Sequence, residues 1–89
     1  MHAAVLAVDF IDEAAARAEL GGLAQQVSGA PGFEGGYWVA LPGSKGIAVV
    51  LFDSEGGAQA LVEQARSAPE GQGGVVSTMS EVGEVIASA

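Results

Sequence analysis

The sequence predicts an α+β fold with the element order β-α-β-β-α-β. Two runs, residues 3–10 (AAVLAVDF) and 47–53 (IAVVLFD), are apolar at even and odd positions alike, which is typical of strands buried on both faces. Two other stretches repeat apolar residues every three or four positions, which is typical of amphipathic helices. With 89 residues, the chain has the length of one domain, residues 1–89, with one core.

The first predicted helix follows the first strand. Asp12 occupies an N-cap position and Glu13 comes next, where the helix dipole favours a carboxylate. The apolar stripe of this helix consists of Ala16, Leu20, Leu23 and Val27. The pair Gly21-Gly22 costs about 1 kcal/mol per glycine relative to alanine. We therefore expect the helix to be interrupted or to end early at this pair.

A β-hairpin is predicted in the middle of the chain. The segment 33–41 (FEGGYWVAL) is aromatic-rich, and the Gly/Pro-containing segment 42–46 separates it from the strand 47–53. The pair Gly35-Gly36 weakens the strand 33–41 and indicates a bulge or an edge position.

A second helix and a fourth strand complete the order. Ser54 is the expected N-cap of a helix that runs to Arg66. The glycine-rich segment 67–74 predicts a loop, and the alternating segment 75–87 predicts a strand with one exposed side, bent at Gly83. The apolar stripe of this second helix consists of Ala58, Leu61, Val62 and Ala65.

This order of elements is that of the ferredoxin-like fold, with an antiparallel four-stranded sheet in the order 4-1-3-2 and two helices on one face. The two runs that are apolar throughout become the central strands. Two helices cover only one face, so the alternate residues of the same runs would leave an apolar second face in water. The simplest cover is a second copy of the sheet, and we expect a homodimer with sheet-on-sheet packing.

The composition excludes several classes of function. Three Lys and Arg against eleven Asp and Glu give a net charge of 3 − 11 = −8, which makes nucleic acid an unfavourable partner. The absence of cysteine excludes disulfides, thiolate metal sites and Cys nucleophiles. The run 3–8 is too short to span a bilayer and lacks the basic flank of a secretory signal. We expect a soluble, cytoplasmic protein with no membrane partner.

Two short segments carry a resemblance to a known superfamily. They are Ala30-Pro31-Gly32-Phe33 at the start of the second strand and Leu51-Phe52-Asp53-Ser54-Glu55 between the third strand and the second helix. With these segments and this order of elements, the chain resembles the dimeric α+β barrel superfamily. That superfamily includes antibiotic-biosynthesis-type monooxygenases and stress-responsive A/B barrel proteins. The chain looks most like small actinobacterial-type members with a Gly-Tyr-Trp segment and a Val-Val-Leu-Phe strand.

The resemblance implies the fold and the homodimer, and the chain departs from the family in two respects. Haem-degrading members ligate iron through a histidine of the second helix, and residues 54–66 contain none. Cofactor-free monooxygenase members often place Asn, Trp and His around the substrate, and this chain has no Asn.

Tyr37-Trp38 is the most distinctive candidate for a ligand site. The two side chains lie on opposite faces of a strand, so one of them could line a pocket beside Gly35 or Gly36 and stack on a flat substrate. The alternative is that both pack in the core or in a dimer interface. Phe33 and Phe52 are the expected walls of such a substrate-binding pocket.

The other polar residues favour structural roles. His2 is the only histidine and has no obvious catalytic partner. The two central strands are expected to run parallel in this sheet order, which would bring Asp9 and Asp53 to one end of the sheet as an acid/base pair or a hard-metal site. The alternative is that they and Asp12 are caps and solvated strand ends. Neither glycine-rich loop, 43–46 or 71–74, has the context of a phosphate-binding loop. The cations Arg17, Lys45 and Arg66 are too dispersed for an anion-binding patch.

Two functions stay open, and neither implies a cofactor or a metal. The first is a non-catalytic homodimer that binds a hydrophobic small molecule or acts as a stress-related module. The second is a cofactor-independent, monooxygenase-like enzyme acting on a planar hydrophobic molecule, with the protein positioning the substrate and excluding water. The first is favoured because the chain lacks paired titratable residues whose environments could separate their pKa values. A Trp38 that is accessible in a cleft beside a polar side chain would favour the second.

Overall fold

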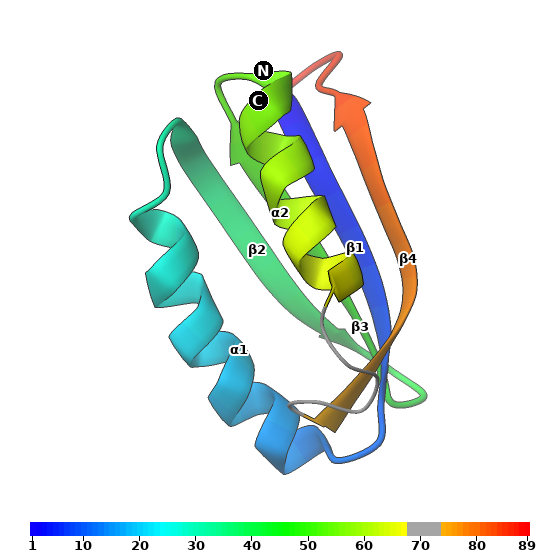
Figure 1. The fold of residues 1–89 in the computed structure, drawn as a ribbon. Helices are drawn as coiled ribbons and strands as arrows, with labels where there is room; N and C mark the ends of the chain where they lie inside the picture. Colours follow the sequence, from blue (N-terminus) through cyan, green and yellow to red (C-terminus); the bar gives the residue numbers. More distant parts are fainter. Residues whose placement is uncertain (68–73) are drawn as a thin grey trace.

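The computed structural model describes residues 1–67 and 74–89 and has the predicted order of elements (Figure 1). Four strands and two helices follow one another along the chain. They are β1 (His2–Phe10), α1 (Glu13–Ser28), β2 (Phe33–Leu41), β3 (Lys45–Phe52), α2 (Glu55–Ser67) and β4 (Val75–Glu84).

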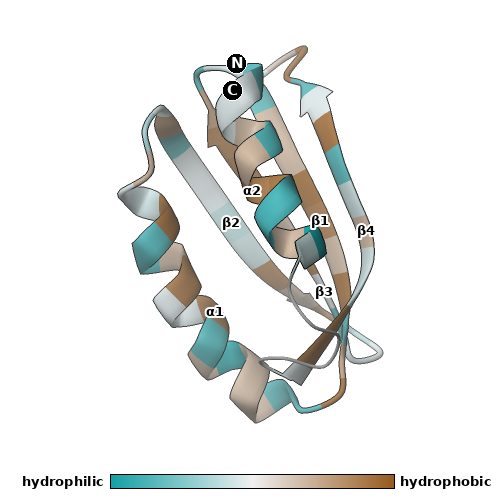
Figure 2. Ribbon diagram, viewed as in Figure 1, coloured by the Kyte–Doolittle hydropathy of each residue, from teal (hydrophilic) through white to brown (hydrophobic). Residues whose placement is uncertain are grey.

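The four strands form one antiparallel sheet in the order β2-β3-β1-β4, which is the predicted order 4-1-3-2 counted from the other edge. Both helices lie on the same face of the sheet (Figure 1). The ferredoxin-like α+β fold is therefore confirmed. Figure 2 shows hydrophobic segments along β1 and in the visible part of β3, as expected for central strands, and further ones near both ends of β4.

The expected pairing of Asp9 with Asp53 is wrong. It assumed parallel central strands, whereas β1 and β3 are antiparallel, with Asp9 opposite Lys45 and His2 opposite Phe52. Asp9 and Asp53 consequently lie at opposite ends of the sheet. Asp53 instead follows the last residue of β3, where its backbone N–H donates to the carbonyl of Gly32 at 2.8 Å. Gly32 has φ +80°, and a Cβ there would overlap the Asp53 carboxylate, so this contact requires glycine.

Helix α1 is continuous through Gly21-Gly22, contrary to the expected interruption. Asp12 caps it as predicted, and its Oδ1 accepts a hydrogen bond from the Ala15 N–H at 3.1 Å. The two ends of the helix are anchored by Ala16 and Val27, the two residues of its stripe that are buried. Burial at both ends compensates for the low helix propensity of the glycine pair, because tertiary packing supplies most of the stability of a helix.

Helix α2 covers the centre of the sheet. Ser54 caps it as predicted, with Oγ accepting from the Gly57 N–H at 3.3 Å. Its inner face buries Ala58, Leu61 and Val62. These side chains join one core cluster with Ala4, Val27, Ala48, Val50 and Phe52. This is the core that the two apolar runs predict.

Both edge strands depart from regular pairing, and in β2 the departure lies where the sequence indicated it. The register of β2 against β3 shifts between Phe33 and Gly35, which is the bulge expected next to the glycine pair. Strand β4 ends at Glu84 rather than at Ala87, and its pairing with β1 shifts register at the Ala7/Val8 step; the bend at Gly83 stays a prediction. The predicted loop 67–74 falls largely on residues 68–73, outside the described residues, and so does most of the glycine-rich segment 71–74.

Neither of the two helices in the described residues lies on the second face of the sheet. Cross-strand pairs on this face include Val49 opposite both Tyr37 and Val5, and Ile47 opposite both Val39 and Ala7. On the other side of β1, Ala7 lies opposite Met79 of β4 and Val5 lies opposite Glu81 of β4. Several of its side chains are exposed, namely Tyr37 (72%), Val39 (45%), Leu41 (42%) and Met79 (39%). This apolar face, called the open face below, matches the surface that the sequence predicts. Neither α1 nor α2 is long and apolar enough to cross a bilayer, and no other helix lies in the described residues.

The core position of Phe52 leads to a stability prediction. The ring is 2% exposed and meets Phe33 edge to face, with ring centroids 6.2 Å apart. We expect Phe52→Ala to lower the free energy of unfolding by about 3–5 kcal/mol, because it leaves a cavity that the neighbours cannot fill. Urea denaturation at one fixed protein concentration measures the change. Ile86→Ala, at a side chain that is 92% exposed, is the control and should change it by less than about 0.5 kcal/mol. An equal effect of both substitutions would contradict the assigned core.

Candidate functional site

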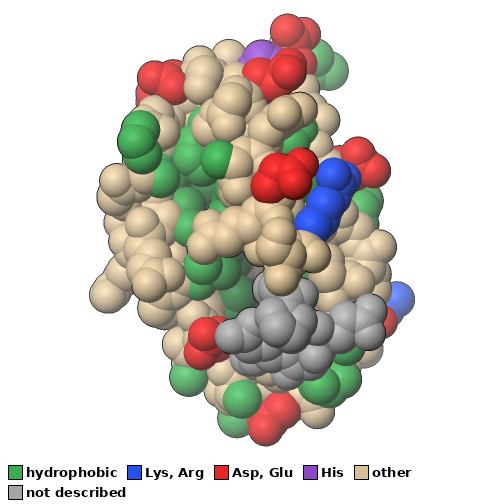
Figure 3. All heavy atoms as spheres, in the orientation of Figure 1, with side chains coloured by type: hydrophobic (Ala, Val, Ile, Leu, Met, Phe, Trp, Pro, Cys, Tyr) green, Lys and Arg blue, Asp and Glu red, His purple; other side chains and the backbone are tan. Residues whose placement is uncertain are grey.

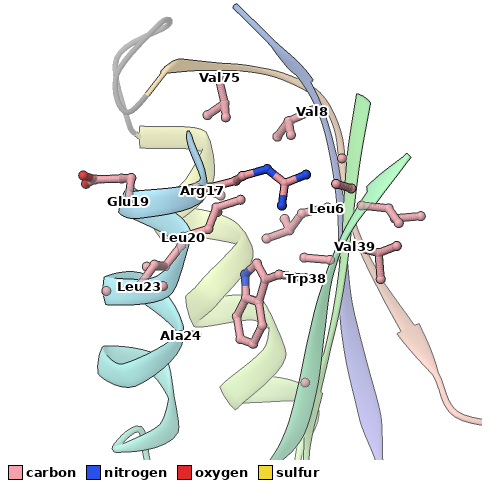
Figure 4. A pocket seen from close by; sticks show the side chains of 18 of the residues that line it. Leu6, Val8, Arg17, Glu19, Leu20, Leu23, Ala24, Trp38, Val39 and Val75 are labelled. Atoms are coloured by element: carbon pink, nitrogen blue, oxygen red, sulfur yellow. The ribbon is translucent and has the colours of Figure 1, made fainter. Parts of the chain in front are cut away.

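An open cavity of about 950 Å³ lies between the two helices and the sheet (Figure 4). This volume is in the range of small-molecule sites. Its walls are mainly apolar side chains from β1, α1, β2 and β4. They include Leu6, Val8, Leu20, Leu23 and Trp38, and Arg17 is a charged lining residue. Figure 3 shows hydrophobic side chains between the two helices, where the surface is hollowed.

The cavity lies beneath the middle turns of α1, which are buried less completely than its two ends. Ala16 and Val27 are buried, whereas Leu20 and Leu23 of the same stripe remain partly exposed and line the cavity. The opposite wall includes small residues on β2 and β3, namely Gly36, Ala40, Gly46 and Ala48. The Trp38 ring covers Gly36, and Phe10 and Val8 pack closely on Gly46.

Trp38 is the aromatic wall of the cavity. It is partly buried, packs against the core cluster and lies on the same face of the sheet as the helices (Figure 4). Its six-membered ring lies over Gly36, where a Cβ would come within 3.0 Å of Cζ3 and 3.2 Å of Cη2. The absence of a side chain at Gly36 therefore leaves room for the indole, as predicted for either Gly35 or Gly36.

The other three predicted site residues lie elsewhere. The side chain of Tyr37 alternates with that of Trp38 and is 72% exposed on the open face, so only its backbone borders the cavity. Phe52 is in the core cluster and Phe33 packs against that cluster; neither lines the cavity. Contact of these four residues with a ligand stays a prediction, and the geometry brings only Trp38 to the cavity through its side chain.

Sequence reasoning missed Arg17. The three cations are dispersed as expected: Arg66 donates from Nη2 to the Ser80 carbonyl at 2.7 Å, and Lys45 lies opposite Asp9. Arg17 nevertheless reaches into the cavity from α1 (Figure 4). The signal in the sequence was its spacing, because Arg17 comes three residues before Leu20 and directly after Ala16 of the apolar stripe.

The remaining polar candidates are outside the cavity. His2 Nε2 lies 3.5 Å from a Glu55 carboxylate oxygen, and its buried Nδ1 has no hydrogen-bond partner among the described residues. Asp12 serves as the α1 cap and Asp53 follows β3 beside Gly32. Within residues 1–67 and 74–89, no three His, Asp or Glu side chains are grouped so that they could hold a metal ion.

Comparison of the chain with protein-family models and with curated proteins gives no match. The site is therefore interpreted from its own geometry and chemistry.

The position of Trp38 over Gly36 can be tested by fluorescence, because the chain has one tryptophan. A methyl group at Gly36 would displace the indole, whereas a Cβ at the neighbouring Gly35 meets nothing within 4 Å. We expect Gly36→Ala to shift the emission maximum to longer wavelength as the ring moves into water, and Gly35→Ala to leave it unchanged. The two emission spectra measure this. Identical shifts in both variants would contradict the assigned packing.

Proposed function

We propose that this chain is a homodimeric ligand-binding protein that takes a hydrophobic small molecule into the cavity between α1 and the sheet. The observation that carries the proposal is a cavity of about 950 Å³ whose apolar walls surround a partly exposed tryptophan. Largely apolar concave sites with a few polar groups are the usual form of small-molecule sites.

The absence of paired acid/base groups in the cavity supports binding over catalysis. Its charged lining residues within the described part of the chain are Arg17 and Glu19, and Glu19 points away from the cavity (Figure 4). Arginine remains protonated under all ordinary conditions and is a poor proton acceptor. General acid–base chemistry would need a group with a pKa nearer the working pH.

Ligand entry is expected to change the emission of Trp38. We predict that titration with flat hydrophobic compounds, such as anthraquinone and flavone, gives a saturable change in Trp38 fluorescence corrected for absorption by the ligand. The cavity-lining substitution Ala24→Phe should abolish the change by filling the space. Ala14→Phe places the same side chain on an exposed part of α1 outside the cavity and should preserve it. Equal responses of the two variants would exclude this cavity as the binding site.

The open face supports the dimeric part of the proposal. Its apolar side chains run across all four strands, and its exposed members include Tyr37, Val39 and Met79. Each large side chain gains roughly 1.5–3 kcal/mol when it is fully buried. A second copy of the same face offers self-complementary cover through a two-fold axis. The cavity lies on the opposite face, so such packing leaves it accessible.

Sedimentation equilibrium tests this assembly. We expect the wild-type chain to sediment as a dimer at micromolar concentration and Ile47→Lys or Val39→Lys to sediment as a monomer, because a lysine at the contact would be buried unpaired. Gln59→Lys, on the exposed side of α2, adds the same charge away from the open face and should leave the dimer intact. A wild-type chain that is folded and monomeric under these conditions would exclude the dimer.

One observation favours the cofactor-independent, monooxygenase-like alternative. Trp38 is accessible in a cavity beside a polar side chain, Arg17, which is the arrangement that the sequence analysis associates with an enzyme. Oxygen consumption in the presence of a compound that saturates the Trp38 signal distinguishes the two functions. Consumption that Ala24→Phe abolishes would support the enzyme, whereas saturation without consumption supports a binding protein.

A further inference from the structure

Two hydrogen-bond donors, the Arg17 guanidinium and the indole N–H of Trp38, lie at one end of the cavity. Arg17 extends from α1 into the cavity, and the indole of Trp38 presents its nitrogen-bearing edge towards the Arg17 end (Figure 4). This orientation agrees with the position of Cζ3 and Cη2, the atoms far from Nε1, over Gly36. Both groups only donate hydrogen bonds.

The donors of Arg17 are largely unused by the protein. Nε lies 3.4 Å from the Glu13 carboxylate, and the side chains of Arg17 and Glu13 are 65% and 48% exposed. Among the described residues, neither Nη atom of Arg17 makes a hydrogen bond, whereas Nη2 of Arg66 donates to the Ser80 carbonyl. Arg17 thus keeps the planar pair of donors that matches a carboxylate.

Trp38 Nε1 adds a second donor that has no partner among the described protein groups. No side-chain hydrogen bond of the described residues involves it. A ligand that filled the cavity with hydrocarbon alone would remove this N–H from water without a partner, which is unfavourable. An acceptor group at the Arg17 end of the ligand would satisfy both donors.

We propose that the ligand is a hydrophobic carboxylate, with its charged end on Arg17 and Trp38 Nε1 and its apolar body against Leu6, Val8 and Leu20. This inference rests on the proposed ligand-binding function and names the class of ligand. It follows from charge complementarity, because the one charged side chain that points into the cavity from the described residues is a cation (Figure 4). In a chain of net charge −8, the local pair of donors has to overcome the long-range repulsion of an anion.

A pair of ligands with the same shape tests the charge. Biphenyl-4-carboxylate and biphenyl-4-carboxamide are titrated into the full chain by calorimetry, and the single indole N–H signal is followed by NMR. We expect the carboxylate to bind about tenfold more tightly than the amide, because charge-assisted hydrogen bonds are about twice as strong as neutral ones. Arg17→Gln should weaken the carboxylate about tenfold and leave the amide unchanged.

Two matched variants complete the design. Arg66→Gln removes the other arginine, which does not line the cavity, and should leave the binding of both compounds unchanged. Glu13→Gln removes the competing carboxylate while retaining Arg17 and should strengthen binding of the carboxylate. A thermal melt checks that each variant is folded.

The outcomes separate this inference from the proposed function. Equal binding of carboxylate and amide, or an equal loss of both in Arg17→Gln, would overturn the carboxylate assignment and leave a hydrophobic ligand site standing. Absence of binding by both compounds, with no shift of the indole signal, would overturn the assignment together with the proposed function.

Discussion

The close packing of α2 on the centre of the sheet determines the rest of this molecule. Phe52 lies so near Gly57 that a Cβ there would come within 2.8 Å of its ring, and Ala58, Leu61 and Val62 complete the contact. Helix α2 thereby packs against β1, β3 and β4, and α1 is left with β2 at the edge. Helix α2 buries Ala58, Leu61 and Val62 along one face, whereas α1 buries only Ala16 and Val27, one near each end.

The cavity is a consequence of this unequal division. Because Ala16 and Val27 anchor α1, its middle turns span the sheet without filling the space beneath them. Small residues on β2 and β3 line the space, and Trp38 closes one side of it. A protein interior is normally packed without such voids, so a cavity lined by partly exposed apolar side chains indicates a site for another molecule. Arg17 gives that site a charged end.

The placement of both helices on one face of the sheet accounts for the high apolar content of the chain. A chain with 49% hydrophobic and 16% charged residues has more apolar surface than two helices can cover. The surplus is on the open face, on alternate residues of the strands whose other residues form the core. The acidic side chains belong mostly to helices, turns and edge strands, and few interrupt the open face. A net charge of this size favours solubility of the chain while that face stays apolar.

The sequence by itself determined the order of elements, the central strands, both helix caps and the bulge near Gly35, because each depends on local chemistry and on the period of apolar residues. It also determined that Tyr37 and Trp38 lie on opposite faces, since alternation along a strand is a property of the backbone. The strand directions followed only from the assembled sheet, and they separate Asp9 from Asp53.

Only the tertiary structure decided that Trp38 rather than Tyr37 faces the cavity, that Phe33 and Phe52 belong to the core region, and that Arg17 reaches the indole's side of the cavity. It also decided that α1 continues through its two glycines. These outcomes depend on how far α1 stands from the sheet, which is set by contacts between residues distant in sequence. No local sequence pattern predicts the distance between α1 and the sheet.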